Sequence, residues 1–178
     1  LPEGFGVAVN LSSRNLSDPQ LEPWVRDLVQ GWQLAPSSLC FEMSERQLME
    51  DPGQTLEVLH RLRHIGVRLA IDDFGTGYSS MSYLRELPVD EVKIDRRFVA
   101  DLEAGDDTIA RSVIDLGHNL GLHVVAEGVE SAATLEHLQE LGCDSAQGYH
   151  LGMPMPLPDL EAFLSGRRDV IVATTAFG

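Results

Sequence analysis

The feature of this sequence that most limits its fold is a repeated step from a helix, through a glycine, into a strand. It occurs at Ile65-Gly66, Leu120-Gly121 and Leu141-Gly142, where an amphipathic stretch ends and a short apolar run follows. Glycine is typical of a helix C-terminus because it adopts a left-handed conformation without steric cost. A helix that leads directly into another strand is the pattern of parallel β/α units.

Six strand–helix units are predicted along the chain. Strands or extended segments are expected at residues 5–11, 39–45, 67–71, 91–95, 122–125 and 143–151, and helices at 21–32, 54–65, 78–87, 106–120, 133–141 and 159–164. The spacing in the helix at 106–120 predicts that its inner positions are Ile109, Val113, Leu116 and Leu120.

The number of units favours an incomplete barrel. A closed (β/α)8 barrel has eight units and about 250 residues, whereas this chain has 178 residues. We therefore predict an α/β fold, a (β/α)8 TIM-like barrel that here lacks about two N-terminal units. An open doubly wound sheet is the alternative fold, but no Gly-x-Gly-x-x-Gly motif follows the first predicted strand.

Composition restricts the class of ligand. The chain has 28 acidic and 13 basic residues and a formal net charge of −15 at pH 7, which argues against binding duplex nucleic acid through its phosphates. A small phosphorylated ligand is compatible with this charge if metal ions or a few arginines supply positive charge. Cys40 and Cys143 lie in apolar runs and are expected to be buried free thiols of a reducing cytoplasm.

The ends of the sequence give two further expectations. The sequence contains neither a signal peptide nor an apolar run near the length of a membrane span, so we expect no membrane segment in this chain. It opens with Leu1-Pro2-Glu3 rather than with a start methionine, and we expect it to be a piece of a longer protein.

The most informative stretch follows the third predicted strand. Asp72 and Asp73 come directly after the apolar residues 67–71 and are followed by a Gly-x-Gly turn. Adjacent carboxylates repel each other and are costly to desolvate unless a positive group lies between them. Because a strand end directs consecutive side chains to different sides, the two aspartates could face two ions, or one ion and one backbone group. Capping of a helix near Thr76 would explain one aspartate and leave the other unexplained.

Polar side chains also end the other predicted strands. In a parallel barrel the carboxyl ends of all strands open on one face, where barrel active sites lie. Oxygen ligands without histidine or cysteine suit Mg²⁺ or Mn²⁺ rather than Zn²⁺. Two ions about 3.5–4 Å apart, sharing Asp72, would account for the number of carboxylates and could act on a phosphodiester. The residues expected on this face are Asn10, Glu42, Asp72, Asp73, Lys93, Glu127 and Gln147.

Each of these residues also has a purely structural interpretation. Asn10 could cap a turn, Lys93 could extend to the surface, and Glu127 could pair with an arginine. Glu42 is harder to explain in this way, because an unpaired acid between apolar neighbours is costly. Gln147 alone is uninformative, so the hypothesis depends on the joint pattern.

Six short blocks in a fixed order carry a family resemblance. They are VNLS at 9–12, FEMSE at 41–45, IDDFGTGYSS at 71–80, VKID at 92–95, AEGVE at 126–130 and QGY at 147–149, ahead of Pro154. The chain resembles the EAL domain of cyclic di-GMP phosphodiesterases over nearly its whole length, and the third block is highly specific. The resemblance implies a (β/α)8-type barrel with one antiparallel strand that hydrolyses the bacterial messenger cyclic di-GMP to linear pGpG with two Mg²⁺ or Mn²⁺ ions.

The resemblance also implies roles for individual residues. Lys93 and Glu127 are expected to be catalytic, with Lys93 positioning or polarising the attacking water. The implied metal ligands are Asn10, Glu42, Asp72, Asp73 and Glu127, and the implied substrate-binding residues are Gln147, Asp95 and Arg14. Glu45 is expected to anchor the loop after Asp73, a regulatory loop formed by Phe74, Gly75, Thr76, Gly77, Tyr78, Ser79 and Ser80.

The resemblance further implies partners and a location. We expect residues 1–166 to form the EAL-type domain and residues 167–178 to be a C-terminal tail. The loop after Asp73 would link the site to the interface of a homodimer, and the full-length protein would carry an upstream sensor or diguanylate-cyclase-like domain. The expected location is the bacterial cytoplasm, including the cytoplasmic part of a membrane-anchored protein.

Departures from the family pattern keep other functions open. The Glu-Ala-Leu signature and the arginine that follows it are not in this sequence, and the resemblance places them on a strand before Leu1. Ser44 stands where threonine is usual. The intact set of acids favours catalysis, although this fragment alone could be inactive. A non-catalytic cyclic di-GMP receptor is the alternative, and a third hypothesis is a one-metal barrel that uses Lys93 as a base.

Overall fold

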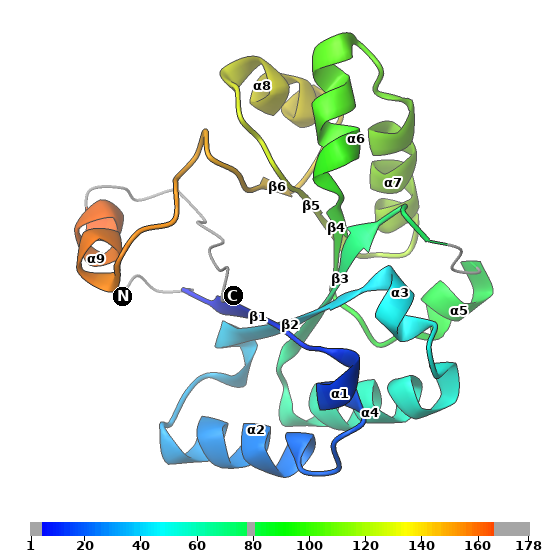
Figure 1. Cartoon of the computed structure of the whole chain (residues 1–178), viewed down its shortest axis with the longest axis vertical. Helices are drawn as coiled ribbons and strands as arrows, with labels where there is room; N and C mark the ends of the chain where they lie inside the picture. The colour runs from blue at the N-terminus through cyan, green and yellow to red at the C-terminus, as the bar shows by residue number, and fades with distance from the viewer. Residues whose placement is uncertain (1–4, 78–80, 166–178) are drawn as a thin grey trace.

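The computed structural model describes residues 5–77 and 81–165 of the chain (Figure 1). Six strands form one sheet in the order β1-β2-β3-β4-β5-β6, and every described pair is parallel. The strands are β1 (Val7–Asn10), β2 (Leu39–Ser44), β3 (Arg68–Phe74), β4 (Glu91–Ile94), β5 (His123–Ala126) and β6 (Ser145–Ala146). Because spatial order follows chain order without a reversal, the doubly wound alternative is excluded.

The sheet curves into a half-barrel with helices on its outer side (Figure 1). The helices are α1 (Ser13–Leu16), α2 (Leu21–Gly31), α3 (Glu45–Leu48), α4 (Pro52–Ile65), α5 (Met81–Glu86), α6 (Arg96–Asp101), α7 (Thr108–Asn119), α8 (Ala132–Glu140) and α9 (Leu157–Ser165), with 3-10 turns η1 (Pro36–Ser38) and η2 (Leu102–Ala104). The predicted α/β barrel class with six units is confirmed. The antiparallel strand implied by the resemblance is not among the described pairs.

Burial is greatest in the middle of the sheet. Leu69, Ala70 and Ile71 of β3 are fully buried, whereas Val7 and Val9 of β1 are 41% and 40% exposed. β1 is an edge of the described sheet, so strand neighbours cover it from one direction only. The central strands β2 to β5 therefore form the rigid part of the fold.

One prediction about the inner face of α7 is wrong. Ile109 is exposed at 44%, and the buried face of α7 consists of Ala110, Val113, Ile114 and Gly117. A Cβ built on Gly117 would lie 2.5 Å from Cγ2 of Val124 on β5 and 3.3 Å from Cγ2 of Val92 on β4, so glycine permits the helix to approach the sheet at this point. The buried side of α7 therefore includes a glycine at its closest approach to the sheet, together with the apolar residues Val113 and Ile114.

The cysteines differ from each other. Both are free thiols, but Cys40 is buried on β2 and Cys143 is only half-buried before β6. Burial raises the pKa of Cys40 to about 12 and that of Cys143 to about 11. The expectation of two buried thiols is thus correct for Cys40 and wrong for Cys143.

Some predicted features lie outside the described residues. These are Tyr78, Ser79 and Ser80 of the loop and the tail at 167–178. Within residues 5–77 and 81–165, none of the helices combines the length and apolar character that crossing a membrane requires.

The packing of α7 can be tested with an alanine substitution. Gly117→Ala should lower the free energy of unfolding by about 1–3 kcal/mol, because the added methyl group overpacks the contact with β4 and β5. Gly31→Ala in α2 is the matched control, since a Cβ there meets no atom within 4 Å. The control should leave stability unchanged or raise it by up to about 1 kcal/mol. Urea unfolding followed by circular dichroism measures both, and equal stability of the two variants would contradict this account of α7.

Candidate functional site

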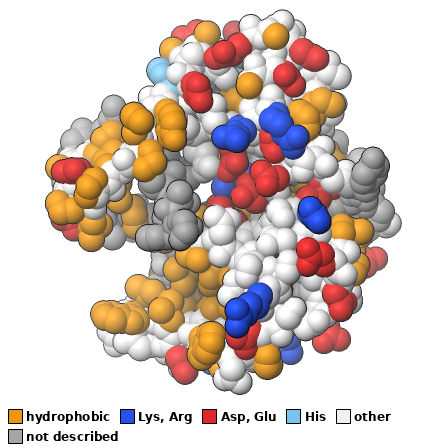
Figure 2. Space-filling view, viewed as in Figure 1, with side chains coloured by type: hydrophobic (Ala, Val, Ile, Leu, Met, Phe, Trp, Pro, Cys, Tyr) orange, Lys and Arg blue, Asp and Glu red, His pale blue; other side chains and the backbone are white. Residues whose placement is uncertain are grey.

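The predicted polar residues meet where the central strands end. Glu42 lies on β2 and Lys93 on β4, both buried, and Glu127 and Gln147 directly follow β5 and β6. Parallel pairing in register sets these strand ends side by side, so that their side chains share one mouth of the half-barrel. Figure 2 shows Asp and Glu side chains gathered in the middle of this face, with Lys and Arg side chains beside them.

Lys93 lies at the centre of the group. Its Nζ is 2.5 Å from Oε1 of Glu127, 2.9 Å from Oε1 of Glu42 and 3.9 Å from Oδ1 of Asp72. Burial disfavours the charged ammonium, but the surrounding carboxylates outweigh this effect and raise the pKa of Lys93 above its ordinary value. The side chain is therefore a fixed positive charge at neutral pH.

A β-bulge places both aspartates in the site. Between β3 and β4 the register passes from Ile71↔Val92 to Phe74↔Ile94, so β3 contains one extra residue. Asp73 at this bulge adopts a left-handed backbone with φ of 52°. Oxygen atoms of Asp72, Asp73 and Glu127 consequently lie within 4.8 Å of one another. Regular strand alternation predicts that the side chains of Asp72 and Asp73 point to different sides of the sheet. The bulge interrupts this alternation, so the prediction does not hold here.

Glu127 is held between a cation and an amide. Nε2 of Gln147 donates a hydrogen bond of 2.6 Å to the same Oε1 of Glu127 that contacts Lys93. Burial raises the pKa of Glu127 to about 7, with Lys93 opposing the shift and Asp72 adding to it. Oε1 of Gln147 is buried and has no hydrogen-bond partner in the described part of the chain. An acceptor of this kind is available to a ligand that donates a hydrogen bond.

Asp95 connects the site to α6. Its carboxylate caps the helix and accepts hydrogen bonds from the backbone N and side chain of Arg97. Burial raises the pKa of Asp73, and the neighbouring Asp72 and Asp95 raise it further. Burial alone would raise the pKa of Asp95, but the bonds from Arg97 lower it below its ordinary value. Arg97 is not among the residues predicted from the sequence, although the Asp-x-Arg spacing at a strand end is a signal for this contact.

Glu45 holds the loop after Asp73. Its Oε2 accepts hydrogen bonds from the backbone N of Gly75 at 3.2 Å and of Gly77 at 2.9 Å. A Cβ on Gly77 would lie 2.8 Å from Cδ of Glu45, so the contact requires glycine. The anchoring geometry expected of Glu45 is present, and the regulatory role of the loop stays a prediction.

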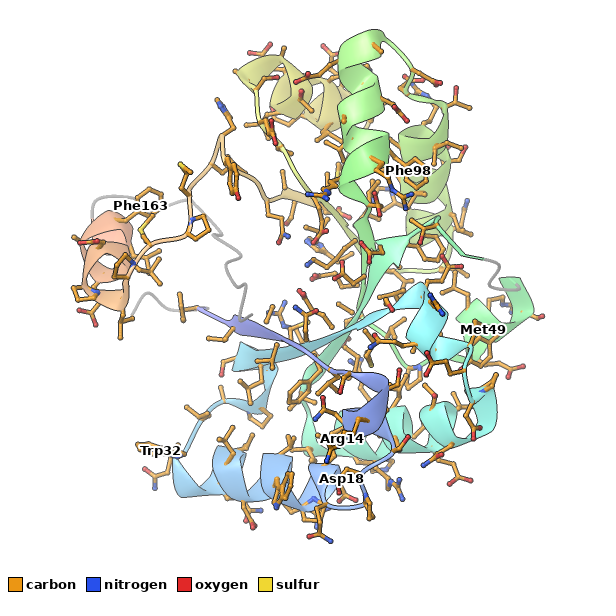
Figure 3. The ribbon with its side chains drawn as sticks, in the orientation of Figure 1. Arg14, Asp18, Trp32, Met49, Phe98 and Phe163 are labelled. Carbon is orange, nitrogen blue, oxygen red and sulfur yellow. The ribbon has the colours of Figure 1, made fainter. Side chains whose placement is uncertain are left out.

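Two predicted residues are not joined to the carboxylates by any described contact. Asn10 is the exposed last residue of β1, and Ser12 rather than Asn10 caps α1. Arg14 is exposed on α1, and Figure 3 shows it beside α4. Their assignment to the metal and to the substrate remains a prediction.

The charges of the site suit divalent cations. Lys93 contacts Glu42, Asp72 and Glu127, and Asp73 lies close to two of these acids. This group of four acids and one ammonium has three uncompensated negative charges when all four acids are ionised. Carboxylates without histidine or cysteine are the donor set that Mg²⁺ and Mn²⁺ prefer. Asp72, Asp73 and Glu127 are already close enough together to share ions.

Comparison with known proteins places the chain in a family. The model of the EAL domain matches residues 2–154. The chain belongs to the EAL domain family.

The relatives that the chain matches are much longer than the chain. The cyclic di-GMP phosphodiesterase NbdA of Pseudomonas aeruginosa is 45% identical over 168 residues, which cover 93% of this chain and 22% of NbdA. The bifunctional diguanylate cyclase/cyclic di-GMP phosphodiesterase MucR of the same species is 44% identical over 160 residues, 89% of this chain and 23% of MucR. The chain therefore spans about a fifth of the length of the relatives it matches.

Solved EAL structures share the fold. The PaMucR phosphodiesterase in a c-di-GMP complex has a TM-score of 0.82 and 44% identity, over 87% of this chain and 64% of that chain. The EAL domain of Mycobacterium smegmatis DcpA has a TM-score of 0.85 and 38% identity, over 93% of this chain and 75% of that chain. At these identities the half-barrel corresponds to part of the TIM-like barrel of the family.

The pKa of Glu127 predicts how metal affinity depends on pH. Below pH about 7 a proton occupies this carboxyl and competes with a cation, so affinity for Mn²⁺ should weaken progressively as the pH falls from about 8 to 6. Electron paramagnetic resonance of free Mn²⁺ measures the affinity without substrate. Glu127→Gln should bind more weakly and lose most of the pH dependence. Affinity of the unaltered chain that is constant over this range would contradict the role of Glu127.

Proposed function

We propose that this chain is the metal-binding part of a phosphodiesterase that hydrolyses cyclic di-GMP to linear pGpG with two divalent ions. The observation that carries the proposal is that oxygen atoms of Asp72, Asp73 and Glu127 lie within 4.8 Å of one another, beside the buried Lys93, which contacts Asp72 and Glu127. Membership in the EAL family and the names of the relatives NbdA and MucR support the choice of substrate.

The metal site follows from the carboxylates that lie closest together. Asp72, Asp73 and Glu127 would hold the ions, with Glu42 as an additional ligand opposite Lys93. Two Mg²⁺ or Mn²⁺ ions bound there supply a water of lowered pKa and polarise the phosphate oxygens. The excess negative charge of the four acids is the physical reason for the cations to bind.

Lys93 acts as a permanent positive charge. Its raised pKa makes it a poor base and a good hydrogen-bond donor, which disfavours the hypothesis of a one-metal barrel that uses Lys93 to abstract a proton. A buried ammonium beside the reacting phosphate orients the attacking water and stabilises the negative charge that develops in the transition state. Its contacts with Glu42 and Glu127 fix its position before substrate binds.

Gln147 and Glu127 complete the proposed site. The hydrogen bond between them holds the Glu127 carboxylate, and the unpaired Oε1 of Gln147 offers an acceptor to the ligand.

Asp95 and Arg14 remain proposed substrate contacts. We further propose a homodimer and an additional signalling domain in the full-length protein, since MucR is named as a bifunctional cyclase and phosphodiesterase. A cytoplasmic location belongs to the same proposal.

Replacement of the central aspartate tests this function. Asp72→Asn keeps the shape of the side chain but removes its charge. The rate of cyclic di-GMP hydrolysis should fall more than about 100-fold. This is a larger loss of activity than is usual when a residue that only orients a metal ligand is replaced. Asp107→Asn is the control, because Asp107 is paired with Arg111 on α7 and has no described contact with the site. Rates are measured by chromatography of pGpG, for the chain alone and within its full-length protein.

Three results are distinguishable. Loss of hydrolysis in Asp72→Asn but not in Asp107→Asn supports the proposal. Unchanged hydrolysis in Asp72→Asn contradicts the metal assignment. Calorimetric binding of cyclic di-GMP without turnover by the full-length protein contradicts catalysis and favours the receptor function.

A further inference from the structure

A single aspartate connects three elements at the start of the last described strand. Asp144 directly precedes β6, and its Oδ2 accepts a hydrogen bond of 2.8 Å from the backbone N of Val124 on β5. The same oxygen lies 3.0 Å from Nε2 of His118 in the last turn of α7 and 3.9 Å from Nδ1 of His123 at the start of β5. Asp144 therefore links the start of β6 to its neighbouring strand and to the helix that precedes that strand.

The strand that follows Asp144 has few backbone contacts of its own. β6 pairs with β5 only through Val125↔Ser145 and Ala126↔Ala146, and it is the last strand of the described sheet (Figure 1). Two half-buried residues provide little hydrophobic pattern to determine the register of a strand. Oγ of Ser145 lies 2.7 Å from Nε2 of His123, which adds a second side-chain contact at this point. Side-chain contacts at its start therefore contribute much of the alignment of β6.

The register of β6 sets the position of Gln147. The backbone N of Gln147 donates to the carbonyl of Ala126 at 2.8 Å, and its carbonyl accepts from the N of Val129 at 3.0 Å. Its side chain donates from Nε2 to Oε1 of Glu127 at 2.6 Å. A shift of β6 along β5 by one residue would break the backbone bonds and turn the Gln147 side chain to the other face of the sheet. The contact with Glu127 thus depends on how the start of β6 is held.

A second aspartate of the fold makes an equivalent set of contacts. Asp90 directly precedes β4, its Oδ2 accepts from the backbone N of Leu69 on β3 at 3.0 Å, and its carboxylate pairs with Arg63 in the last turn of α4. In both cases the aspartate before one strand bonds to the second residue of the preceding strand and to a side chain at the end of the helix before it. β4, however, has four residues and a strand on each side, so β6 depends more on its aspartate.

We propose that Asp144 is a positioning residue, which fixes the register of β6 against β5 and thereby holds Gln147 on the carboxylate of Glu127. The inference rests on the proposed function, in which Glu127 is a metal ligand, and it adds a residue that neither the sequence pattern nor the family resemblance assigned. Carboxylates that bind metal ions are oriented by hydrogen bonds from residues outside the site, and loss of these bonds weakens metal affinity. Asp144 acts one step further away, through Gln147.

The first test follows the side-chain amide of Gln147 by nuclear magnetic resonance, without metal or nucleotide. Gln147→Ala identifies the resonance by its loss. Asp144→Ala should shift this resonance and speed the exchange of its protons with water, because the hydrogen bond to Glu127 is weakened. Asp144→Asn should give a smaller shift, since asparagine keeps an oxygen that can accept from the backbone N of Val124.

Binding of Mn²⁺ tests whether the effect reaches the proposed metal site. Gln147→Ala should raise the dissociation constant about 10-fold, and Asp144→Ala should raise it by between about threefold and about 10-fold. Because Asp144 acts through Gln147, the double variant should bind no more weakly than Gln147→Ala alone. A residue that only stabilises the fold would not show this dependence. Electron paramagnetic resonance gives the free Mn²⁺, and thermal unfolding verifies that each variant is folded.

Asp106→Ala is the matched control. Oδ1 of Asp106 accepts a hydrogen bond of 3.0 Å from the backbone N of Thr108, and Asp106 has no described contact with β6 or with the site. The substitution removes the same charge and a similar bond to the backbone. It should leave the Gln147 resonance in place and the affinity for Mn²⁺ within about twofold of the unaltered chain.

A milder variant covers the case in which Asp144→Ala does not fold. His118→Ala removes one partner of the Asp144 carboxylate and leaves its bond to Val124. It should shift the Gln147 resonance in the same direction as Asp144→Asn, and an unchanged resonance would contradict the proposal.

The outcomes separate this inference from the proposed function. If Asp144→Ala leaves the Gln147 resonance and the affinity for Mn²⁺ unchanged, the positioning role is wrong while the metal site stands. If Asp144→Ala weakens binding equally with and without Gln147, it does not act through Gln147 and the role is also wrong. If the unaltered chain binds no Mn²⁺ even at millimolar concentration, the proposed metal site fails, whereas a shifted Gln147 resonance in Asp144→Ala would still support the role of Asp144 in placing Gln147.

Discussion

The structure depends on a charge imbalance at the carboxyl ends of its central strands. Three acids contact one buried ammonium, and a fourth, Asp73, lies close to two of them. The three acids nearest to one another come from β3 and the end of β5. Such an arrangement is costly for a protein without further cations, because desolvated like charges repel each other. It becomes favourable when divalent ions bind, so the electrostatic strain of the site is the basis of its proposed chemistry.

The rest of the fold serves to hold these charges at short separation. Buried parallel strands bring the side chains of Glu42 and Lys93 into contact, and the bulge in β3 turns Asp73 toward Asp72. Glu45 anchors the loop that follows, and Arg97 secures Asp95 from α6. The contacts around the site come from segments that are distant in sequence, as expected for a barrel in which each strand end contributes one or two residues.

Sequence reasoning predicts the site residues better than their geometry. Polar residues at the ends of apolar strands identify Glu42, Lys93 and Glu127, because burial there demands partners. Three features depend on tertiary contacts that no local pattern encodes. The first is the left-handed backbone of Asp73, and the second is the orientation of α7, which leaves Ile109 exposed. The third is the short helix α6, which has too few apolar residues to show helical spacing. Asn10 differs again, since it is an exposed residue at the end of an edge strand and has no described side-chain contact with the carboxylates.

The most direct measurement is a crystal structure of the chain grown with Mn²⁺, with the anomalous signal of the metal used to locate it. The account predicts two peaks about 3.5–4 Å apart, with Asp72 contacting both and Asp73 and Glu127 contacting one or the other. Lys93 should remain within hydrogen-bond distance of Glu42. An anomalous map without peaks between these carboxylates at saturating Mn²⁺, with Lys93 still bonded to Glu127, would contradict the account.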